Sequence, residues 1–370
     1  MAHLDHLTVR DFRNVARADL DFPREGVVVI GDNGQGKTNL LEAIYYFQLL
    51  RSLRGARDAD LVRFGASAFH LHATVTTVGQ HEISAGFGRG RKKVVVDGAE
   101  VKRLSGALGS LPAVVISPRD VALVSGAPSE RRRFLDVALA LTSTRYLNAL
   151  QRYRGALTRR NAALRGVARG VQSEQSVAVW EPALADSGAV LLSERLDWMD
   201  RHQSEFQRLT AAIGEPEEMT MRYVTSIAEP RDAAAELSDT LARKRTLDIR
   251  RGLTHTGPHR DDVALQIGGH DLRTFGSGGQ QRTAAIALRL LEAETLKAHS
   301  GSDPVLLLDD PFAELDARRS GHILRLLHET VTGQTILAVP RADDIPPDLS
   351  RLPRWSITEG NIGESAANVA

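Results

Sequence analysis

Alternating apolar and polar positions run through the first part of the chain and predict strands. Residues 6–12 and 18–22 alternate like the two strands of a hairpin, and further alternating segments follow between residues 69 and 101. A continuous apolar run at 26–30 leads through a glycine-rich loop into a helical segment that ends near residue 50. The pattern predicts a buried strand, a loop and a helix beside an antiparallel side sheet.

From about residue 129 to residue 251, strand patterns give way to helix formers. Apolar residues recur there at spacings of three and four, at Leu135, Leu139, Tyr146, Leu150, Tyr153, Leu157 and Leu164. The stretch RGVARGVQSEQSV interrupts two helical runs and indicates an exposed turn. This region is predicted to be an antiparallel helical arm.

Strand and helix patterns alternate again after residue 251, which indicates an α/β sheet. The predicted fold class is therefore α/β, with a mixed sheet, helices and an antiparallel side sheet, plus a second, helical domain. Residues 1–128 and 252–370 are expected to form one split domain, and residues 129–251 the arm.

Composition narrows the class of protein. The 370 residues are 42% hydrophobic and 25% charged, which is ordinary for a globular chain large enough for two cores. Cysteine is absent, so disulfide frameworks, cysteine-ligated zinc and iron–sulfur clusters are excluded, and a reducing cytoplasm is expected. No apolar signal region and no run of about 18 apolar residues is found, so no membrane association is expected.

The segment GDNGQGKT matches the phosphate-loop pattern G-x-x-x-x-G-K-[ST] and has the required strand before it and helix after it. Backbone amides of such a loop converge on the nucleotide phosphates, the lysine neutralises them, and the threonine hydroxyl ligates Mg²⁺. ATP is the expected cofactor, held by Gly31, Asp32, Asn33, Gly34, Gln35, Gly36, Lys37 and Thr38.

The segment VLLLDD predicts a buried strand that delivers two aspartates to the same nucleotide. Asp309 is expected to join Thr38 as a Mg²⁺ ligand, and Asp310 to polarise the attacking water. An acidic pair after an apolar run is also what a strand end turning into solvent looks like. Because aspartate is one methylene shorter than glutamate, slow turnover is expected.

A second glycine-rich turn, GSGGQQR, opens a long amphipathic helix far from the phosphate loop. One γ-phosphate has few open faces once the loop, Lys37 and Mg²⁺ surround it. We therefore expect Ser277, Gly279 and Gln280 to cap the nucleotide of a second copy of the chain, so that ATP favours a two-fold dimer. The alternative interpretation is an ordinary N-capped helix start.

Several motifs together resemble those of ABC-type ATPase heads, and the long separation between the two turns resembles SMC-like DNA-repair ATPases. SPRDVALVSGAPSERRRFLD, TGPHRDD, GGQQR, LLDDPFAELDARR and the early DFRN resemble the RecF family, in its order and over nearly the whole chain. Three departures stand out. They are Gly278 in the signature turn, Pro311 with Ala313 in the acidic motif, and Pro340 where related heads place a histidine or threonine.

The resemblance implies a weak, DNA-stimulated ATPase that dimerises with ATP on gapped or junction DNA. It also implies work with RecR and RecO to load the recombinase RecA in DNA repair, replication restart and the SOS response. Carried over by motif, Lys37, Asp309 and Asp310 are the catalytic residues, with Ser277 acting in trans. Arg13 and Asn14 lie where related heads contact nucleotide.

Arginine clusters supply the candidate contacts to DNA phosphates. They comprise Arg51, Arg54, Arg57, Arg89, Arg91, Lys92, Lys93, Arg152, Arg159 and Arg160. Each cluster alone is also compatible with a plain solvated face. Aromatic residues make up 5% of the chain and form no ladder, so backbone recognition without base reading is expected.

Two further motifs receive structural interpretations. The arginines of SERRRFLD, residues 131–133, are expected to join the arm to the head by pairing acids such as Asp136, and DNA binding is the alternative interpretation. THTGPHRDD is expected to brace the returning chain rather than bind a metal.

Two functions compete with the leading one. A transporter-type ATPase would place the signature about 100 residues after the phosphate loop, which disfavours it here. A nucleotide-dependent DNA scaffold that never hydrolyses ATP remains open because of Asp310 and Pro340.

Overall fold

The structure is a computed structural model that describes residues 2–227, 232–312, 317–330 and 333–364. The chain divides into two compact units. We call Met1–Asp120 with Leu288–Ala370 the head unit, and Val121–Ala287 the insert unit. The division falls inside one helix, α9 (Gly278–Ser300).

A six-stranded sheet, ordered β15-β14-β3-β13-β12-β8, carries the sequence motifs of the head unit. The strands are β3 (Gly26–Ile30), β8 (Ala113–Ile116), β12 (Val305–Asp309), β13 (Thr335–Val339), β14 (Arg354–Thr358) and β15 (Asn361–Glu364). All neighbours are parallel except β14 and β15. Ile30 pairs with Val339 and Asp309 with Ala338, so the phosphate-loop strand and the aspartate strand end at the same edge.

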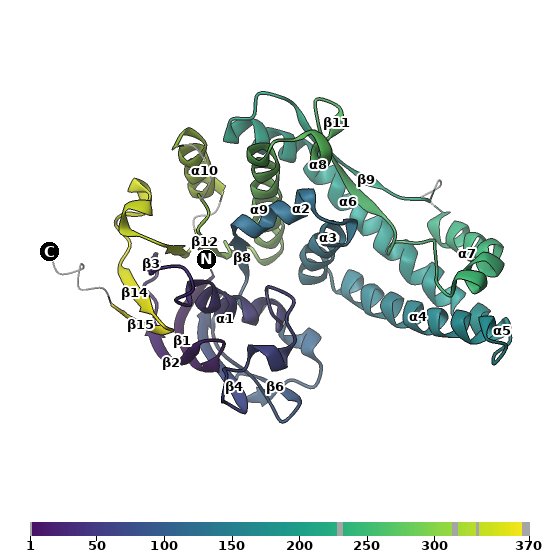
Figure 1. The fold of residues 1–370 in the computed structure, drawn as a ribbon, viewed down its shortest axis with the longest axis horizontal. Coiled ribbons are helices and arrows are strands. Elements are labelled where there is room, and N and C mark those ends of the chain that lie inside the picture. The colour runs from purple at the N-terminus through teal and green to yellow at the C-terminus, as the bar shows by residue number, and fades with distance from the viewer. Residues whose placement is uncertain (1, 228–231, 313–316, 331–332, 365–370) are drawn as a thin grey trace. The chain divides into compact units, whose positions relative to one another are not determined.

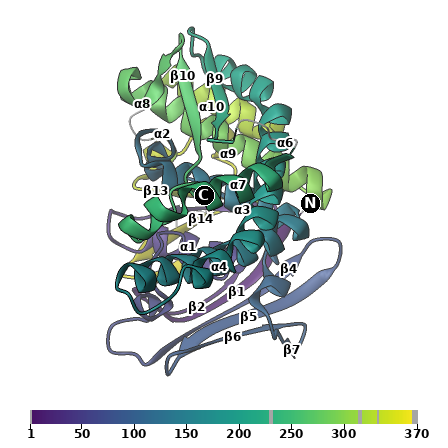
Figure 2. The same cartoon turned by 90° about the vertical axis from the view of Figure 1, so that its right-hand side faces the viewer.

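A second sheet in the head unit is antiparallel, in the order β2-β1-β4-β5-β6-β7, as the alternating pattern predicts (Figure 2). Its strands are β1 (His3–Phe12), β2 (Val15–Asp21), β4 (Ala68–Thr76), β5 (Gln80–Gly88), β6 (Arg91–Val96) and β7 (Ala99–Glu100). Alternate residues of β4 are buried, which gives this sheet one face toward the core.

Helix α1 (Lys37–Leu49) packs between these two sheets (Figure 1). Every residue from 40 to 48 is buried, including the polar Glu42 and Gln48, so the helix has no solvent face. A helix surrounded by protein needs no amphipathic stripe. The remaining helical elements described in the head unit are η1 (Asp58–Leu61), η2 (Leu104–Ala107), η3 (Pro118–Val121), α10 (Ala317–Thr330), η5 (Ala342–Asp344) and η6 (Pro347–Leu349).

Helices dominate the insert unit, and the two longest, α4 and α6, pack along each other (Figure 1). The helices are α2 (Ala122–Ser125), α3 (Pro128–Thr142), α4 (Thr144–Ala168), α5 (Gln175–Ala178), α6 (Glu181–Ile213), α7 (Ala233–Arg251) and α8 (Leu272–Phe275). The first predicted helical run is broken at Ser143, whose hydroxyl accepts a hydrogen bond from the Tyr146 amide and caps α4.

The insert unit is larger than the arm expected at residues 129–251. A three-stranded sheet, ordered β11-β10-β9, joins β9 (Met219–Val224) to β10 (Asp262–Ile267) and β11 (His270–Asp271). This pairing ties the chain after residue 251 to the helical region, because β10 bonds to β9 along its length. Among the described residues, no helix combines the length and apolar character that crossing a membrane requires.

Candidate nucleotide-binding site

The phosphate loop, residues 31–38, connects β3 to α1 with a backbone shape that its glycines permit. Gly36 has a φ of 120°, which favours glycine. A Cβ atom there would lie 2.8 Å from the side-chain amide of Asn14. The Lys37 ammonium folds over the loop and donates hydrogen bonds to two loop carbonyls, including that of Asp32 at 3.0 Å. The loop is therefore closely packed against Asn14 and the Lys37 side chain.

Thr38 and Asp309 meet beside this loop. The Thr38 hydroxyl donates a hydrogen bond to Asp309 Oδ2 at 2.8 Å. Burial raises the pKa of Asp309, and the hydrogen bond from Thr38 with the charges of Arg54 and Lys37 only partly offsets that effect. A hydroxyl and a carboxylate oxygen at this separation fit the oxygen ligands that Mg²⁺ takes. The pair is a candidate Mg²⁺ site next to the nucleotide phosphates.

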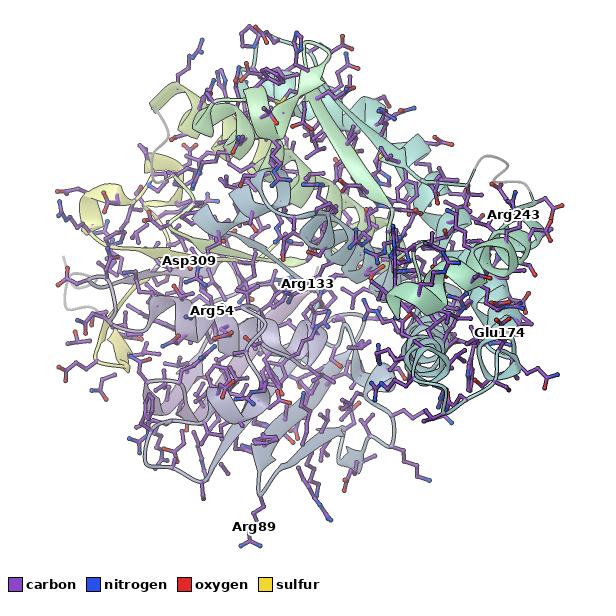
Figure 3. The ribbon with its side chains drawn as sticks, turned by 45° about the vertical axis from the view of Figure 1, so that its right-hand side comes forward. Arg54, Arg89, Arg133, Glu174, Arg243 and Asp309 are labelled. Carbon is purple, nitrogen blue, oxygen red and sulfur yellow. The ribbon has the colours of Figure 1, made fainter. Side chains whose placement is uncertain are left out.

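A cavity of about 380 Å³ lies over the loop, within the head unit. Loop residues line it together with Asp309, Asp310, Arg54 and Arg119. Figure 3 labels Asp309 and Arg54 in this part of the molecule. Burial lowers the pKa of Lys37, and the three nearby aspartates oppose that shift. A lysine and two guanidinium groups facing two carboxylates suit a magnesium triphosphate.

Asp310 departs from strand geometry immediately after β12. Its φ is 49°, and its amide donates to the Ala338 carbonyl at 2.9 Å, which anchors the turn at the sheet edge. The residue lines the nucleotide cavity with Asp309. Ala313, one of the departures from the family pattern, lies outside the described residues. Pro340 follows β13 and has no side chain that can exchange a proton.

Arg119 also lines this cavity, although it is not among the site residues predicted from the sequence. Arg119 belongs to the motif SPRD, which follows β8 at the same edge of the parallel sheet. Its neighbour Asp120 is buried and accepts hydrogen bonds from the Ser117 amide at 2.6 Å and from Arg289 at 2.6 and 3.0 Å. These bonds fix the turn that carries Arg119. The position of the motif directly after a buried strand is the sequence feature that would have identified it.

A series of hydrogen-bonded side chains supports the phosphate loop. Asn14 donates to the Gln35 carbonyl at 2.9 Å and accepts from Asn39 at 2.7 Å, and Arg54 donates to Asn39 at 2.6 Å. The expected Asn14 therefore touches the loop itself. Arg54, predicted as a DNA contact, faces the nucleotide cavity through this series.

The neighbouring Arg13 is held by a buried acid. Its guanidinium donates to Glu42 at 2.9 and 3.3 Å, and its φ of 55° turns the chain at that point. Burial acts to raise the pKa of Glu42, but hydrogen bonds from Arg13 and Ser52 outweigh it, and the net shift is downward. Arg13 thus braces α1, one turn beyond the phosphate loop.

The hairpin of β14 and β15 closes over the other side of the loop. The amides of Glu359 and Gly360 donate to the side-chain and backbone oxygens of Gln35 at 2.6 and 2.8 Å. A Cβ atom at Gly31 would lie 2.4 Å from the Ile357 carbonyl, so only glycine fits there. The loop is held between Asn14 and this hairpin.

The second glycine-rich turn lies in the insert unit and begins α9. The Ser277 hydroxyl accepts from the Gln280 amide at 3.2 Å, and the Gln280 side chain accepts from the Ser277 amide at 2.9 Å. This reciprocal pair is a capping box, so the N-cap alternative is realised in the structure. Ser277 is nevertheless exposed, with Gly278 beside it.

The predicted DNA contacts have different environments. Exposed residues of the set are Arg51, Arg57, Arg89, Arg91, Lys93, Arg152 and Arg159. Arg89 projects from the tip between β5 and β6 (Figure 3). Lys92 is ion-paired with Asp58 at 2.7 Å. The prediction for Arg160 is wrong, because its side chain is 0% exposed and its guanidinium pairs with acids inside the insert unit.

The residues of THTGPHRDD each have a separate partner in the insert unit. His255 bonds Asp248 at 2.8 Å, and His259 bonds the Tyr153 hydroxyl at 2.6 Å and the Thr254 carbonyl at 3.0 Å. Among the described residues, no group of three or more histidine or acidic side chains is arranged to hold a metal ion.

Comparison with known proteins places this chain in a family. The family model described as RecF/RecN/SMC N terminal domain matches residues 3–343. The DNA replication and repair protein RecF of Roseiflexus castenholzii is 35% identical, over 97% of this chain and 99% of that protein. The protein of the same name from Bacillus velezensis is 33% identical, over 94% and 95% of the two chains.

Solved structures agree with the sequence comparison. A structure of the recombination mediator protein RecF with ATP, in the RecFOR pathway, superimposes with a TM-score of 0.90 at 29% identity, covering 99% of this chain and 98% of that one. An Smc head bound to the C-winged helix domain of ScpA gives a TM-score of 0.57 at 14% identity, over 98% and 97%, and shows likeness of fold alone. The fold is that of an ABC-type ATPase head with a mixed sheet, of the kind shared by RecF and SMC proteins.

Proposed function

The chain belongs to the RecF family of DNA replication and repair proteins, and from this membership we propose that it is an ATP-gated, DNA-binding ATPase. The observation that carries the proposal is the convergence of Lys37, Thr38 and Asp309 on one cavity of the head unit. Lys37 would neutralise the β- and γ-phosphates, and Thr38 with Asp309 would hold Mg²⁺. Bound Mg²⁺ would screen the phosphate charge during hydrolysis.

Asp310 is the candidate for polarising the attacking water, because it lines the same cavity and is fixed by its backbone bond to Ala338. Its short side chain and the inert Pro340 favour slow hydrolysis. ATP turnover would then time the release of DNA rather than supply energy for chemistry on it.

Ser277 would act in trans, on the nucleotide held by a second copy of the chain. The exposed turn presents a hydroxyl, the Gly279 amide and the start of a 23-residue helix, all of which favour a phosphate. Gln280 would support the turn through its capping contact. ATP would then bind the dimer better than the monomer and shift association toward it.

Duplex DNA bordering a gap or junction would be held through its backbone by the exposed members of the predicted set of DNA contacts, with no base reading. Loading of RecA together with RecR and RecO is the cellular role that family membership suggests. The relatives are described as replication and repair proteins, and one solved structure as a recombination mediator of the RecFOR pathway.

Because Ser277 also caps α9, the test must separate its proposed role in trans from its role as an N-cap. Ser277→Asp keeps an N-cap oxygen but brings a negative charge to the γ-phosphate, whereas Gln280→Ala weakens the box without adding charge. Sedimentation with ATP should show loss of the dimer for Ser277→Asp and retention for Gln280→Ala. A full ATP-dependent dimer of Ser277→Asp would refute capping in trans.

A nucleotide-dependent scaffold that does not hydrolyse ATP is the second candidate, favoured by Pro340 and the short Asp310. Phosphate release should be measured with and without gapped DNA, for the wild type and Asp310→Asn. ATPase activity in the wild type that falls about 100-fold in the variant supports the leading proposal. No turnover in the wild type, with ATP still bound, supports the scaffold.

A further inference from the structure

The insert unit contains a second cavity, of about 270 Å³, that the nucleotide site does not use. Its charged lining comes from Arg132 and Arg133 of α3, Arg154 of α4 and Arg195 of α6. An apolar wall faces these residues and consists of Leu150, Leu157, Leu191 and the ring of Tyr153. The cavity thus joins a cationic side to an apolar side within one compact unit.

Asp136 is the one carboxylate among the described residues that line this cavity, and it is fully engaged. It accepts hydrogen bonds from Tyr146 at 2.5 Å, from Arg154 at 2.7 Å and from Arg195 at 2.7 Å. Arg195 also donates to Tyr223 at 2.8 Å. The single charge of Asp136 therefore balances one of the four arginines in the lining.

The three consecutive arginines of SERRRFLD have unlike roles. Arg131 is buried and forms a two-pronged pair with Asp262 at 2.7 and 2.8 Å, which is structural. Arg132 donates to the Asp261 carbonyl at 2.7 Å, and no described carboxylate lies within 4.0 Å of its guanidinium. Arg133 has no hydrogen-bond or ion-pair partner among the described residues. The expected pairing with acids thus holds for Arg131 and is wrong for the other two.

The charge left in the cavity favours an anion. The Arg132 side chain is partly buried, and this burial lowers its pKa, while the charges of Asp262 and Asp136 act in the opposite direction. The ring of His259, also in the lining, has its pKa lowered by burial to about 4 and is neutral near pH 7. Partly buried guanidinium groups that form no direct ion pair with a carboxylate bind phosphate and carboxylate oxygens strongly.

We propose that this cavity binds a backbone phosphate of DNA, with the adjoining deoxyribose against the leucine wall. The proposal rests on the DNA-binding function proposed above and assigns it a location. A phosphodiester joins an anion to apolar sugar carbons, which matches the two sides of the cavity. Free phosphate has no group for the leucines, and a carboxylate offers fewer acceptor oxygens to the two unpaired guanidiniums. Contacts of this kind are independent of base sequence.

The salt dependence of DNA binding tests the assignment on the full chain with ATP. The slope of log K against log salt is negative, and its magnitude falls by about 1 for each phosphate contact that is lost on duplex DNA. Because both arginines would contact the same phosphate, Arg132→Gln with Arg133→Gln should reduce the magnitude of the slope by about 1. Arg133→Gln alone should reduce it by part of that amount, and Arg133→Lys should restore it. The matched control is Arg243→Gln, an exposed arginine of α7 outside the cavity (Figure 3), which should leave the slope unchanged.

Three outcomes would overturn the assignment. They are an unchanged slope for Arg133→Gln, an equal loss for Arg243→Gln, and binding of a polyglutamate peptide that depends on Arg133 while DNA binding does not. Thermal melting of each variant shows whether it is folded, and Arg133→Lys separates charge from side-chain volume. Failure of the wild type to bind DNA at all would instead refute the proposed function.

Discussion

The hydroxyl of Thr38 and the carboxylate of Asp309 lie 2.8 Å apart although 271 positions separate them in the chain. The register of three parallel strands produces this contact, because β13 aligns the ends of β3 and β12. Two oxygens from distant parts of the chain can therefore bind one cation, and their effect on Mg²⁺ binding can be measured.

Loss of either oxygen should weaken Mg²⁺ binding to the nucleotide complex. We expect Thr38→Val or Asp309→Asn to raise the Mg²⁺ concentration needed for ATP binding by roughly 10- to 100-fold. Because both oxygens serve one ion, the double variant should lose little beyond Asp309→Asn alone. A Mg²⁺ titration of fluorescent ATP binding measures this. Fully additive losses would show that the two residues act independently.

Lys37 should account for nucleotide-dependent stabilisation. A ligand that binds only the folded protein at 100 times its Kd stabilises it by about 2.7 kcal/mol. In Lys37→Met, which keeps most of the side-chain volume, ATP should give little or no rise in Tm. Glu359→Gln is a suitable control, because its contact with the loop is through its amide and not its side chain. A normal ATP shift in Lys37→Met would contradict the assigned site.

Arg160 should be essential to the insert unit. Its guanidinium bonds Asp248 at 2.8 Å and Glu181 at 3.0 Å with no exposure to solvent. Arg160→Met leaves two buried carboxylates short of a partner and should cost about 3–5 kcal/mol. Urea unfolding followed by tryptophan fluorescence is a suitable measurement, since Trp180 and Trp198 both lie in this unit.

The adjacent Arg159 provides the control for that experiment. It is exposed and stacks its guanidinium over the Trp180 ring at 5.2 Å. Arg159→Met should therefore cost less than about 1 kcal/mol. Equal losses for the two variants would mean that burial of the ion pairs is not what stabilises the unit.

His259 should make the insert unit less stable in mild acid. Burial is the largest cause that lowers its pKa from 6.5 to about 4, while an unfolded histidine still ionises near 6.5. Between these values the unfolded state binds more protons, so stability is full above pH 6.5 and falls as the pH drops toward 4. Its contacts fit the neutral ring, with Nε2 donating to Thr254 and Nδ1 accepting from Tyr153.

The measurement is Tm against pH for the wild type and His259→Gln. The variant should have a flatter profile between pH 6.5 and 4, because the amide cannot take up a proton. A profile as steep as that of the wild type would assign the acid sensitivity to other groups.

Local patterns predicted the parts of the fold that depend on neighbours in sequence. The strand before the phosphate loop follows from a continuous apolar run, and the side-sheet strands follow from alternation. The break at Ser143 was missed, although serine before a helical stretch is a capping pattern, because the apolar spacing continues across it.

Tertiary contacts decided the rest. Arg159 and Arg160 are adjacent and alike in sequence, yet one is exposed and the other has no exposure, because they lie on different sides of α4. Arg54 follows α1 in a stretch rich in arginine, but its hydrogen bond to Asn39 holds its side chain at the nucleotide cavity. The sequence around an arginine does not show whether an acid from a distant part of the chain forms an ion pair with it.

The position of β3 between β13 and β14 has a consequence for synthesis. Both strands that hydrogen-bond to β3 come from beyond residue 334, and so does the hairpin that holds Gln35. A nascent chain that has emerged only as far as α9 therefore displays GDNGQGKT on a strand without either neighbour. Translation must pass residue 360 before the phosphate loop has all of its supports, so a shorter nascent chain lacks part of the nucleotide site.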